Sequence, residues 1–588
     1  MDPRVSAQVR QPAVKWLSVR QLIRTALEVM KATWFARFAD KRDVIGTVRA
    51  GYYALTPPNH TKPVRVDFTA DTGDGFDATF AVARLLAGGQ STDADVPDQG
   101  PAELLVLGGD EVYPVASADN YRQRFTAVFR AARSSYPQFL DHTHGPPVLA
   151  LPGNHDWYDG LSAFRRTFCE SWTRMDDELD PDGLTKVGCY ESDEKTGQRE
   201  VAGGWTTIQS RSYFAIRVHP KWWIWGVDSQ LNAPIDAAQL AYFQQAKRLL
   251  KPDDGVVLLS ATPNWKEADG DSPPDLVRET PLSTMVNFLH RYDLLPPDRQ
   301  QLRMILTGDT HHYARYLPAD PQPDDGEGLE WCPGPALVTC GGGGAFTSPT
   351  HHLKETLSVP WRRTPPRDVT RYRLDKEKVY PRKDESKKLR REIWTMGSRN
   401  GPVLPALIGA LLAVVFWTVA DRQLADVVHP TSAVAAIVLA LVLCAYAATG
   451  IRGKRGSPWQ SRLAKVVIAG VGHTVLHLAA VALVAWVFMV IDPPTLVWVV
   501  AGYLALVVLG TLAFTVYLVL CERFGFHELE AFSSIRSEKF KCVLRLTFDH
   551  AKVSVEVVGL DRVPSARSSA VGELKPRQID YFEVSRTG

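Results

Sequence analysis

The chain has 588 residues, which is more than a single hydrophobic core usually supports, so we expect at least two domains. Lys and Arg total 67 against 65 Asp and Glu, a formal net charge of +2. This near balance excludes the strong overall positive field that favours polyanionic partners, and we expect no nucleic-acid partner.

The cysteines and the N-terminal residues indicate a reducing, cytoplasmic environment. The seven cysteines form no Cys-x-x-Cys pair, and an odd number does not suit a disulfide framework. Residues 1–34 contain neither the apolar core nor the small-residue cleavage site of a secretory signal. We therefore expect no cleaved signal and a cytoplasmic N-terminus.

An amphipathic helix is predicted from about Trp16 to Phe38, within an N-terminal helical segment spanning residues 1–61. Its apolar residues recur at helical spacing with Lys and Arg between them. Two interpretations stay open, because such a helix can lie on a membrane surface or pack against the soluble domain.

Residues 62–360 are predicted to form an α/β domain. Short β-rich runs alternate with helical stretches, and almost every run ends in a polar or glycine-rich loop. Sheets of this class place their ligand chemistry at the carboxyl ends of the strands. The predicted strands lie in VRVDFTA, AELLVLGGD, PVLALPGNHD, WWIWGVDS, GVVLLSATP, RMILTGDTHH and PALVTCGGGG.

Two polar stretches flank or interrupt this domain. Residues 170–204 are rich in turn-forming residues and predict a surface excursion or lid. Residues 361–402 carry many charges, including KKLRRE at 387–392, and predict a solvated basic connector.

Residues 403–520 are predicted to form four transmembrane helices. Four apolar stretches follow one another, roughly at 403–419, 432–449, 466–491 and 495–520, and each is near the ~20 residues that cross a bilayer. The connector and the second loop are basic, whereas the first and third loops are not. The positive-inside rule therefore predicts a multi-pass protein of the cytoplasmic membrane with both termini and the α/β domain in the cytoplasm.

The C-terminal segment, residues 521–588, contains strand-like runs such as CVLRLTF and KVSVEVVGL. Some sixty residues make a marginal core on their own. We expect this β-rich segment to dock onto the 62–360 domain.

Four strand-end loops carry residues suited to a metal centre: DTGDG with Asp71, GGDEVY with Asp110, GNHDW at 153–157 and GDTHHY at 308–313. Hydrolysis of a phosphate ester needs positive charge on the phosphate oxygens and an activated water, which two close divalent ions supply. Such ions take carboxylate, amide and imidazole ligands. Each loop alone is weak, because an Asp at a strand end is often only a helix cap.

The order and spacing of these loops resemble the calcineurin-like metallophosphoesterase superfamily. Asp-x-Gly, Gly-Asp-x-x-Tyr, Gly-Asn-His-Asp and Gly-x-x-His follow in that order between about residues 62 and 350, and Asp71 with Tyr113 resembles the first motifs of purple acid phosphatases. The resemblance implies a four-layer αββα sandwich and a two-metal phosphoesterase. The whole pattern is similar to a membrane-linked bacterial branch of the superfamily.

The resemblance also implies roles for individual residues. Asp110 would bridge the two metals, Asp71 and His311 would hold metal one, and Asn154 would hold metal two. His155 would protonate the leaving oxygen, with Asp156 orienting its ring. Tyr113 is left open between a ligand of metal one and a packing residue.

The sequence departs from the family pattern at two imidazoles of metal two. Ala261 stands where one histidine is usual, and Asp309 replaces another with a carboxylate, which favours Mn²⁺ or Mg²⁺ over Fe or Zn²⁺. Candidates to fill the gap, or to contact substrate, are Asp74, His351 and His352. The run Gly341, Gly342, Gly343 and Gly344 is a candidate wall against phosphate or metal, or only a tight turn.

These observations favour a membrane-anchored enzyme that hydrolyses a phosphomonoester or phosphodiester with metal-activated water. The loss of an imidazole at Ala261 keeps a second hypothesis, in which a degenerate site binds a phosphorylated ligand and acts as a sensor coupled to the membrane helices. A transporter with a regulatory domain is less favoured, because the spans contain few charged residues. A lipid-derived or small phosphorylated substrate is the expected partner.

Overall fold

The computed structural model forms two compact units. The first comprises Met1–Val14, Thr25–Lys383 and Glu538–Gly588, and the second comprises Lys15–Arg24 and Asp384–Ser537. The residues that the structure describes are 10–35, 51–55, 62–88, 99–139, 145–169, 182–187, 199–229, 235–268, 276, 280–295, 301–319, 329–331, 333–361, 367–420, 430–450, 459–491, 494–565 and 574–586.

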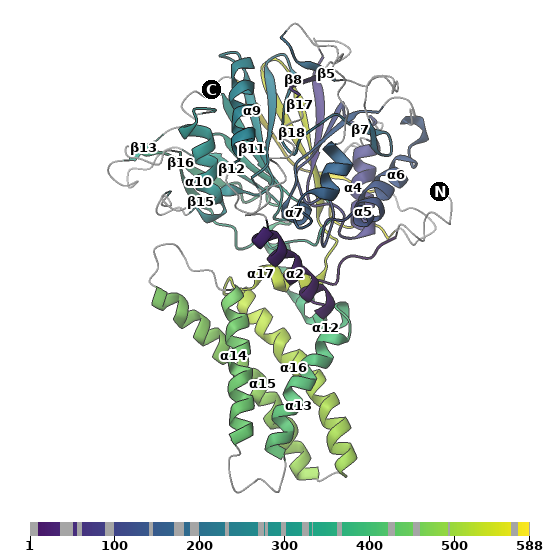
Figure 1. Cartoon of the computed structure of the whole chain (residues 1–588), viewed down its shortest axis with the longest axis vertical. Helices are drawn as coiled ribbons and strands as arrows, with labels where there is room; N and C mark the ends of the chain where they lie inside the picture. Colours follow the sequence, from purple (N-terminus) through teal and green to yellow (C-terminus); the bar gives the residue numbers. More distant parts are fainter. Residues whose placement is uncertain are drawn as a thin grey trace. The chain divides into compact units, whose positions relative to one another are not determined.

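The first unit is built on two mixed β-sheets (Figure 1). One has eight strands in the order β19-β18-β17-β2-β3-β4-β7-β6. Its strands are β2 (Val64–Thr69), β3 (Leu104–Leu107), β4 (Pro147–Ala150), β6 (Arg199–Ala202), β7 (Trp205–Thr207), β17 (Lys541–Phe548), β18 (Lys552–Leu560) and β19 (Arg577–Ser585).

The other sheet has eleven strands, in the order β13-β16-β12-β14-β11-β10-β9-β8-β1-β5, with β15 paired to β16. They are β1 (Tyr53–Leu55), β5 (Thr185–Val187), β8 (Phe214–His219), β9 (Trp222–Val227), β10 (Gly255–Ser260), β11 (Leu302–Thr307), β12 (Tyr313–Pro318), β13 (Leu329–Trp331), β14 (Ala336–Cys340), β15 (Thr356–Pro360) and β16 (Arg367–Leu374). The seven strands predicted from the sequence are among these two sets.

Three apolar layers hold the two sheets and their helices together. The central layer lies between the sheets and includes Phe68 of β2 and Met304 of β11, both buried. A second layer joins the eight-stranded sheet to α4 (Phe76–Gly88) and α6 (Ala127–Arg133). A third joins the other sheet to α9 (Ala237–Leu249) and α10 (Pro281–Val286). The sequence of layers is helix, sheet, sheet, helix, which agrees with the predicted fold class.

The parallel strands of both sheets bring the predicted loops to shared edges. In one sheet β2, β3 and β4 are neighbours and parallel, and in the other β10, β11 and β14 are. Parallel neighbours end at the same edge, so the loops after them converge. Short helices follow some of these loops: α5 (Ala118–Asn120), α7 (Asn154–Trp157) and α8 (Ser162–Phe164).

The C-terminal strands belong to the sheet that carries Asp71. Strand β17 pairs antiparallel with β2, with Leu544 opposite Phe68 and Leu546 opposite Val66, and β18 and β19 extend the sheet outward. The first unit is therefore discontinuous in sequence. The chain leaves it after Lys383 and returns at Glu538.

Two predicted boundaries differ from the structure. Residues 1–61 contain α2 (Val19–Phe35) as predicted, but also β1, which pairs with β5 and β8. The stretch 361–402, predicted as a solvated connector, contains β16 in the large sheet and then α11 (Lys383–Leu389) and α12 (Met396–Arg399). Alternating buried positions of β16, such as Tyr372 and Leu374, are hidden in the sequence by the many charges around them. Most of 170–204 lies outside the described residues; β5 and β6 are its described parts.

The second unit contains the apolar helices α13 (Val403–Ala420), α14 (Pro430–Gly450), α15 (Trp459–Ile491) and α16 (Thr495–Arg523), followed by α17 (Glu528–Ile535). Their facing sides share a core that includes Phe416 and Leu506, whereas other apolar side chains, such as Ile468 and Leu496, are exposed. An exposed apolar surface of this kind suits lipid rather than water.

Two of the described helices are long and apolar enough to cross a membrane, Leu463–Ile491 and Leu496–Arg523. A third span is reached if Lys383–Arg399 and Val403–Trp417, which meet at a bend of 77°, count as one. The helix Val434–Gly450 is apolar but shorter. By length and composition, the described helices thus support two or three of the four predicted spans.

Candidate metal centre

Four of the five residues predicted as metal ligands share an unusual backbone conformation. Asp71, Asp110, Asp309 and His311 all have positive φ, between 45° and 67°. This left-handed conformation costs a residue other than glycine about 1–2 kcal/mol. Such strain persists where the surrounding structure fixes it, and it is frequent at functional sites.

Backbone hydrogen bonds join the loops after β2 and β3. The amide of Asp71 donates to the carbonyl oxygen of Gly109 at 2.9 Å, and the amide of Tyr113 donates to Gly73 at 3.3 Å. Loops from neighbouring strands are therefore held in register. The carboxylates of Asp71 and Asp110 face the same place as a result.

The hydroxyl of Tyr113 lies at the centre of the cluster. Its oxygen is 3.0 Å from Asp71 Oδ1, 3.2 Å from Asp110 Oδ2 and 3.1 Å from His311 Nε2. One hydroxyl has a single proton to donate, so it cannot satisfy both carboxylates and the ring nitrogen together. Three of the residues predicted as ligands, brought from three separate loops, thus gather around one point.

The cluster concentrates negative charge in the protein interior. Burial raises the pKa of Asp71 well above its usual value, and repulsion from Asp110 and Asp309 adds to the shift. The pKa of Asp110 is likewise raised, first by burial and then by Asp156 and Asp309. Asp71 Oδ2 is buried without a hydrogen-bond partner among the described residues. Buried carboxylates in this state are stabilised by a cation, so the residues present fit a divalent metal site.

The Gly-Asn-His-Asp loop packs against Asp110. The amide of His155 donates to Asp110 Oδ1 at 2.8 Å, and its ring lies 4.5 Å from that of Tyr113 between centroids. Asn154 Nδ2 donates to the hydroxyl of Tyr158 at 2.8 Å. This bond fixes the orientation of the Asn154 amide group.

The predicted contact between Asp156 and the ring of His155 is replaced by another arrangement. His155 Nδ1 lies 2.7 Å from the carbonyl oxygen of Pro114, so a backbone carbonyl orients this side of the ring. Asp156 Oδ2 instead accepts from the amides of Gly153 at 2.8 Å and Asp110 at 2.9 Å. Asp156 therefore fixes the loops rather than the imidazole.

Sequence reasoning missed two residues that surround Asp156. The hydroxyl of Tyr121 donates to Asp156 Oδ1. Glu111 is buried, and its pKa is raised well above the usual value by burial and then by the charge of Asp156. The position of Glu111 directly after Asp110, at the end of a predicted strand, was the sequence feature that could have identified it.

Part of the chain matches a known protein family. Residues 64–313 match the calcineurin-like phosphoesterase family. The chain contains a calcineurin-like metallophosphoesterase domain. A purple acid phosphatase from seeds of yellow lupin (Lupinus luteus) matches with a TM-score of 0.27 and 14% identity, over 50% of this chain and 46% of the lupin chain. The match thus spans less than half of that enzyme, and no curated protein matches the sequence.

Asp309 and Ala261 are the two positions where the sequence resemblance led us to expect histidines. The charge of Asp309 adds to the rise in the pKa of both Asp71 and Asp110, after burial and a nearer carboxylate. A Cβ atom built on Gly109, next to Asp110, would lie 2.9 Å from the methyl group of Ala261. Ala261 therefore lies at the site, but its side chain has no ligand atom.

The glycine run at residues 341–344 packs directly on the Asp71 loop. A Cβ atom on Gly341 would lie 2.4 Å from Asp71 Oδ2, and one on Gly343 would lie 2.2 Å from the carbonyl oxygen of Ala70. The amides of Gly341 and Gly343 donate to the carbonyls of His312 and Ala70, at 3.0 and 2.9 Å. These two amides already donate hydrogen bonds within the protein, so we do not assign them to anion binding. The two positions need glycine because a side chain there would collide with Asp71 or Ala70.

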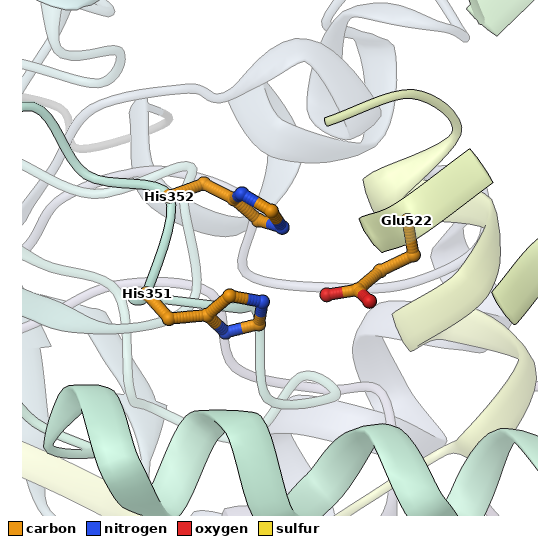
Figure 2. Close-up of side chains that lie close together, drawn as sticks. All are labelled: His351, His352 and Glu522. Carbon is orange, nitrogen blue, oxygen red and sulfur yellow. The ribbon is translucent and has the colours of Figure 1, made fainter. Parts of the chain in front are cut away.

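The remaining candidates have other positions. Asp74 Oδ1 accepts from the amide of Val14 at 2.7 Å and so anchors the N-terminal segment. His351 and His352 lie side by side in the turn before β15, with ring centroids 4.1 Å apart (Figure 2). Glu522, also drawn there, belongs to the second unit and pairs with Arg390 of that unit. The contacts that assemble the cluster around Tyr113 come from other residues.

Lys541, at the start of β17, was not predicted. Its side chain is fully buried, and its Nζ donates to Ala345 O at 2.6 Å. Burial lowers its pKa to about 8. No local sequence signal marks it, because it lies far along the chain from every loop of the site.

Proposed function

We propose that this protein is a membrane-associated, metal-dependent phosphoesterase that hydrolyses a phosphomonoester or phosphodiester. The observation that carries the proposal is the convergence of Asp71, Asp110 and His311 on the hydroxyl of Tyr113, at distances of 3.0–3.2 Å. In this proposal Asp71, Asp110 and His311 would hold one divalent ion, and Asp110, Asn154 and Asp309 would hold a second.

Two divalent ions, when bound, would supply positive charge to the phosphate oxygens and lower the pKa of a water molecule. The protein's own residues do the rest. The loops fixed by Asp156 keep Asp110 and His155 in register, and the strained backbone at Asp71 aims its carboxylate inward. With Asp309 as an oxygen ligand, Mn²⁺ or Mg²⁺ suits the second position better than Zn²⁺.

In this proposal His155 protonates the leaving oxygen. Burial lowers the pKa of its ring to about 4, although the carbonyl of Pro114 opposes this shift. The ring is therefore neutral at pH 7 before substrate arrives. An anionic phosphate beside it favours the imidazolium, so proton donation by His155 would be linked to substrate binding.

The membrane part of the proposal follows from the apolar helices of the second unit. Two or three spans are supported by length and composition. We further propose that four helices cross the membrane with the phosphoesterase domain in the cytoplasm, as the basic loops indicate. An anchored enzyme of this kind has ready access to lipid-derived phosphates.

The proposal is tested with Asp110→Asn and His155→Ala in the full chain. Each is expected to abolish Mn²⁺-stimulated hydrolysis of an aryl phosphate monoester and a bis-aryl diester. Asp253→Asn and His550→Ala are matched controls, because both wild-type side chains are exposed and lie outside the cluster. Hydrolysis that is unchanged in Asp110→Asn would refute the assignment.

A second candidate function rests on Ala261, which contributes no ligand at the place of a usual imidazole. In this alternative the domain binds one ion and a phosphorylated ligand without turnover, and acts as a sensor. Metal analysis distinguishes the two, since two ions per chain with hydrolysis support the enzyme. One ion without hydrolysis supports the sensor.

A further inference from the structure

Helix α2 exposes its apolar face and partly hides its polar face. Leu22, Ile23, Leu27 and Met30 are 44%, 57%, 46% and 49% exposed. At 100° per residue these four side chains cover an arc of about 140°. An ordinary surface helix of a soluble protein turns such a stripe toward the core.

The opposite side of α2 carries polar residues that are less exposed. Gln21, Thr25 and Glu28 are only partly accessible, although they are the residues that water would accommodate best. The helix therefore exposes its apolar side chains and partly buries its polar ones, which is the reverse of a surface helix in a soluble protein. Four large exposed apolar side chains on one helix indicate that this face is covered by something else.

Basic residues border the apolar face along one edge. Arg20, Arg24 and Lys31 fall within about 40° of one another around the helix axis. Glu28 pairs with Lys31 at 3.1 Å, so three positive charges against one negative leave α2 with a net charge of +2. An apolar face with cationic side chains along its edge is the pattern of helices that lie in the interface of an anionic bilayer.

The start of α2 is tied to the start of an apolar helix of the second unit. The amide of Leu17, two residues before α2, donates to Asn400 Oδ1 at 3.2 Å, and α13 begins three residues after Asn400. Val403 and Leu407, on the first turns of α13, are 55% and 50% exposed. The first residues of α2 therefore lie near the residues at which the exposed apolar surface of α13 begins.

We infer that α2 is a membrane-surface helix, whose apolar face inserts into the headgroup region of a bilayer that contains anionic lipid. The inference needs no phosphoesterase activity. Two observations favour lipid over a protein partner. The start of α2 lies next to the apolar helix α13, and basic residues line one edge of its apolar face.

The test uses the full chain in nanodiscs of phosphatidylcholine and phosphatidylglycerol that carry a doxyl-labelled lipid quencher. A fluorescent thiol label is placed at Ile23→Cys on the apolar face or at Glu28→Cys on the polar face, and wild-type protein treated identically gives the background of native cysteines. The Ile23 label is expected to lose its fluorescence to the quencher, whereas the Glu28 label is expected to keep it. Equal quenching at both positions, or none at Ile23, overturns the inference.

A charge variant tests the lipid that is recognised. Arg20→Gln, Arg24→Gln and Lys31→Gln together are expected to reduce quenching at Ile23 in discs with phosphatidylglycerol. In discs of phosphatidylcholine alone, the protein with and without these changes should be quenched equally. Quenching that the charge variant leaves unchanged in both lipids would overturn the role of anionic lipid. An unaltered melting temperature verifies that each variant is folded.

Discussion

Lys541 and Asp71 are joined through a single residue, Ala345. The ammonium group of Lys541 donates to the carbonyl oxygen of Ala345 at 2.6 Å, and the amide of Ala345 donates to the carbonyl oxygen of Asp71 at 2.8 Å. The amide of Cys542 also donates to the carbonyl of Gly342, at 3.1 Å. A strand that follows the membrane helices in sequence thus holds the glycine run against the loop of a proposed metal ligand.

We predict that Lys541→Met weakens both the fold and metal binding. The change leaves the buried carbonyl of Ala345 without its charged donor, which costs about 1–3 kcal/mol. Melting temperature and Mn²⁺ titration measure the two effects, and Lys541→Arg should recover part of each. Lys552→Met, which changes a partly exposed lysine on the neighbouring strand β18, is the control and should change neither. Metal affinity equal to that of wild type in a folded Lys541→Met protein would contradict the prediction.

Gly341→Ala is predicted to disrupt the site by placing a methyl group against Asp71. The added methyl group would lie 2.4 Å from Asp71 Oδ2 and 2.7 Å from the backbone nitrogen of His311, so Asp71 or its neighbours must move. Repacking of this kind typically costs about 1–3 kcal/mol. We expect loss of Mn²⁺-dependent hydrolysis. Gly472→Ala, where no atom lies within 4 Å of the new methyl group, should keep full activity; activity retained in Gly341→Ala would show that the glycine run tolerates a side chain.

Much of this architecture could be predicted from local patterns, and the failures have physical causes. The predicted strands were visible because buried parallel strands form continuous apolar runs, and the ligand loops because polar residues follow each run. Strand β16 was missed because Arg and Asp surround its buried positions. The partner of the His155 ring was misassigned because an adjacent carboxylate was more conspicuous than the carbonyl of Pro114. Lys541 could not be found, since only long-range strand pairing brings it to the site.

Metal binding is predicted to stabilise the protein more at higher pH. In the metal-free fold, burial and mutual repulsion raise the pKa of Asp71 and Asp110 above 3.8, so their contribution to stability is present below that pH and is lost as pH rises through the folded-state pKa. Divalent ions bind the deprotonated carboxylates and compensate for this loss. The gain in melting temperature on adding Mn²⁺ to EDTA-treated protein should therefore increase from about pH 5 to about pH 8.

His312 provides an internal check on this pH dependence. Burial lowers the pKa of its ring to about 4, so its contribution to stability is lost as pH falls from 6.5 toward 4, with or without metal. This loss cancels when the Mn²⁺ and EDTA curves are subtracted. The difference should also nearly vanish in Asp110→Asn, and a gain that is the same at every pH would argue against buried carboxylate ligands.

Rejoining the first unit without the second should preserve the phosphoesterase fold. Strand β17 pairs with β2 and buries Val543, Leu544, Leu546 and Phe548 at 1% exposure or less. Each such side chain contributes about 1.5–3 kcal/mol when buried, so the four together contribute about 6–12 kcal/mol, which is comparable to the whole stability of a typical domain. We expect a protein that ends at Lys383 to aggregate. A protein in which a flexible Gly-Ser linker connects Lys383 to Glu538 should be soluble and monomeric by size exclusion and should bind Mn²⁺. A stable, metal-binding protein that ends at Lys383 would show that the C-terminal strands are dispensable, and that the pairing of β17 with β2 does not build the site.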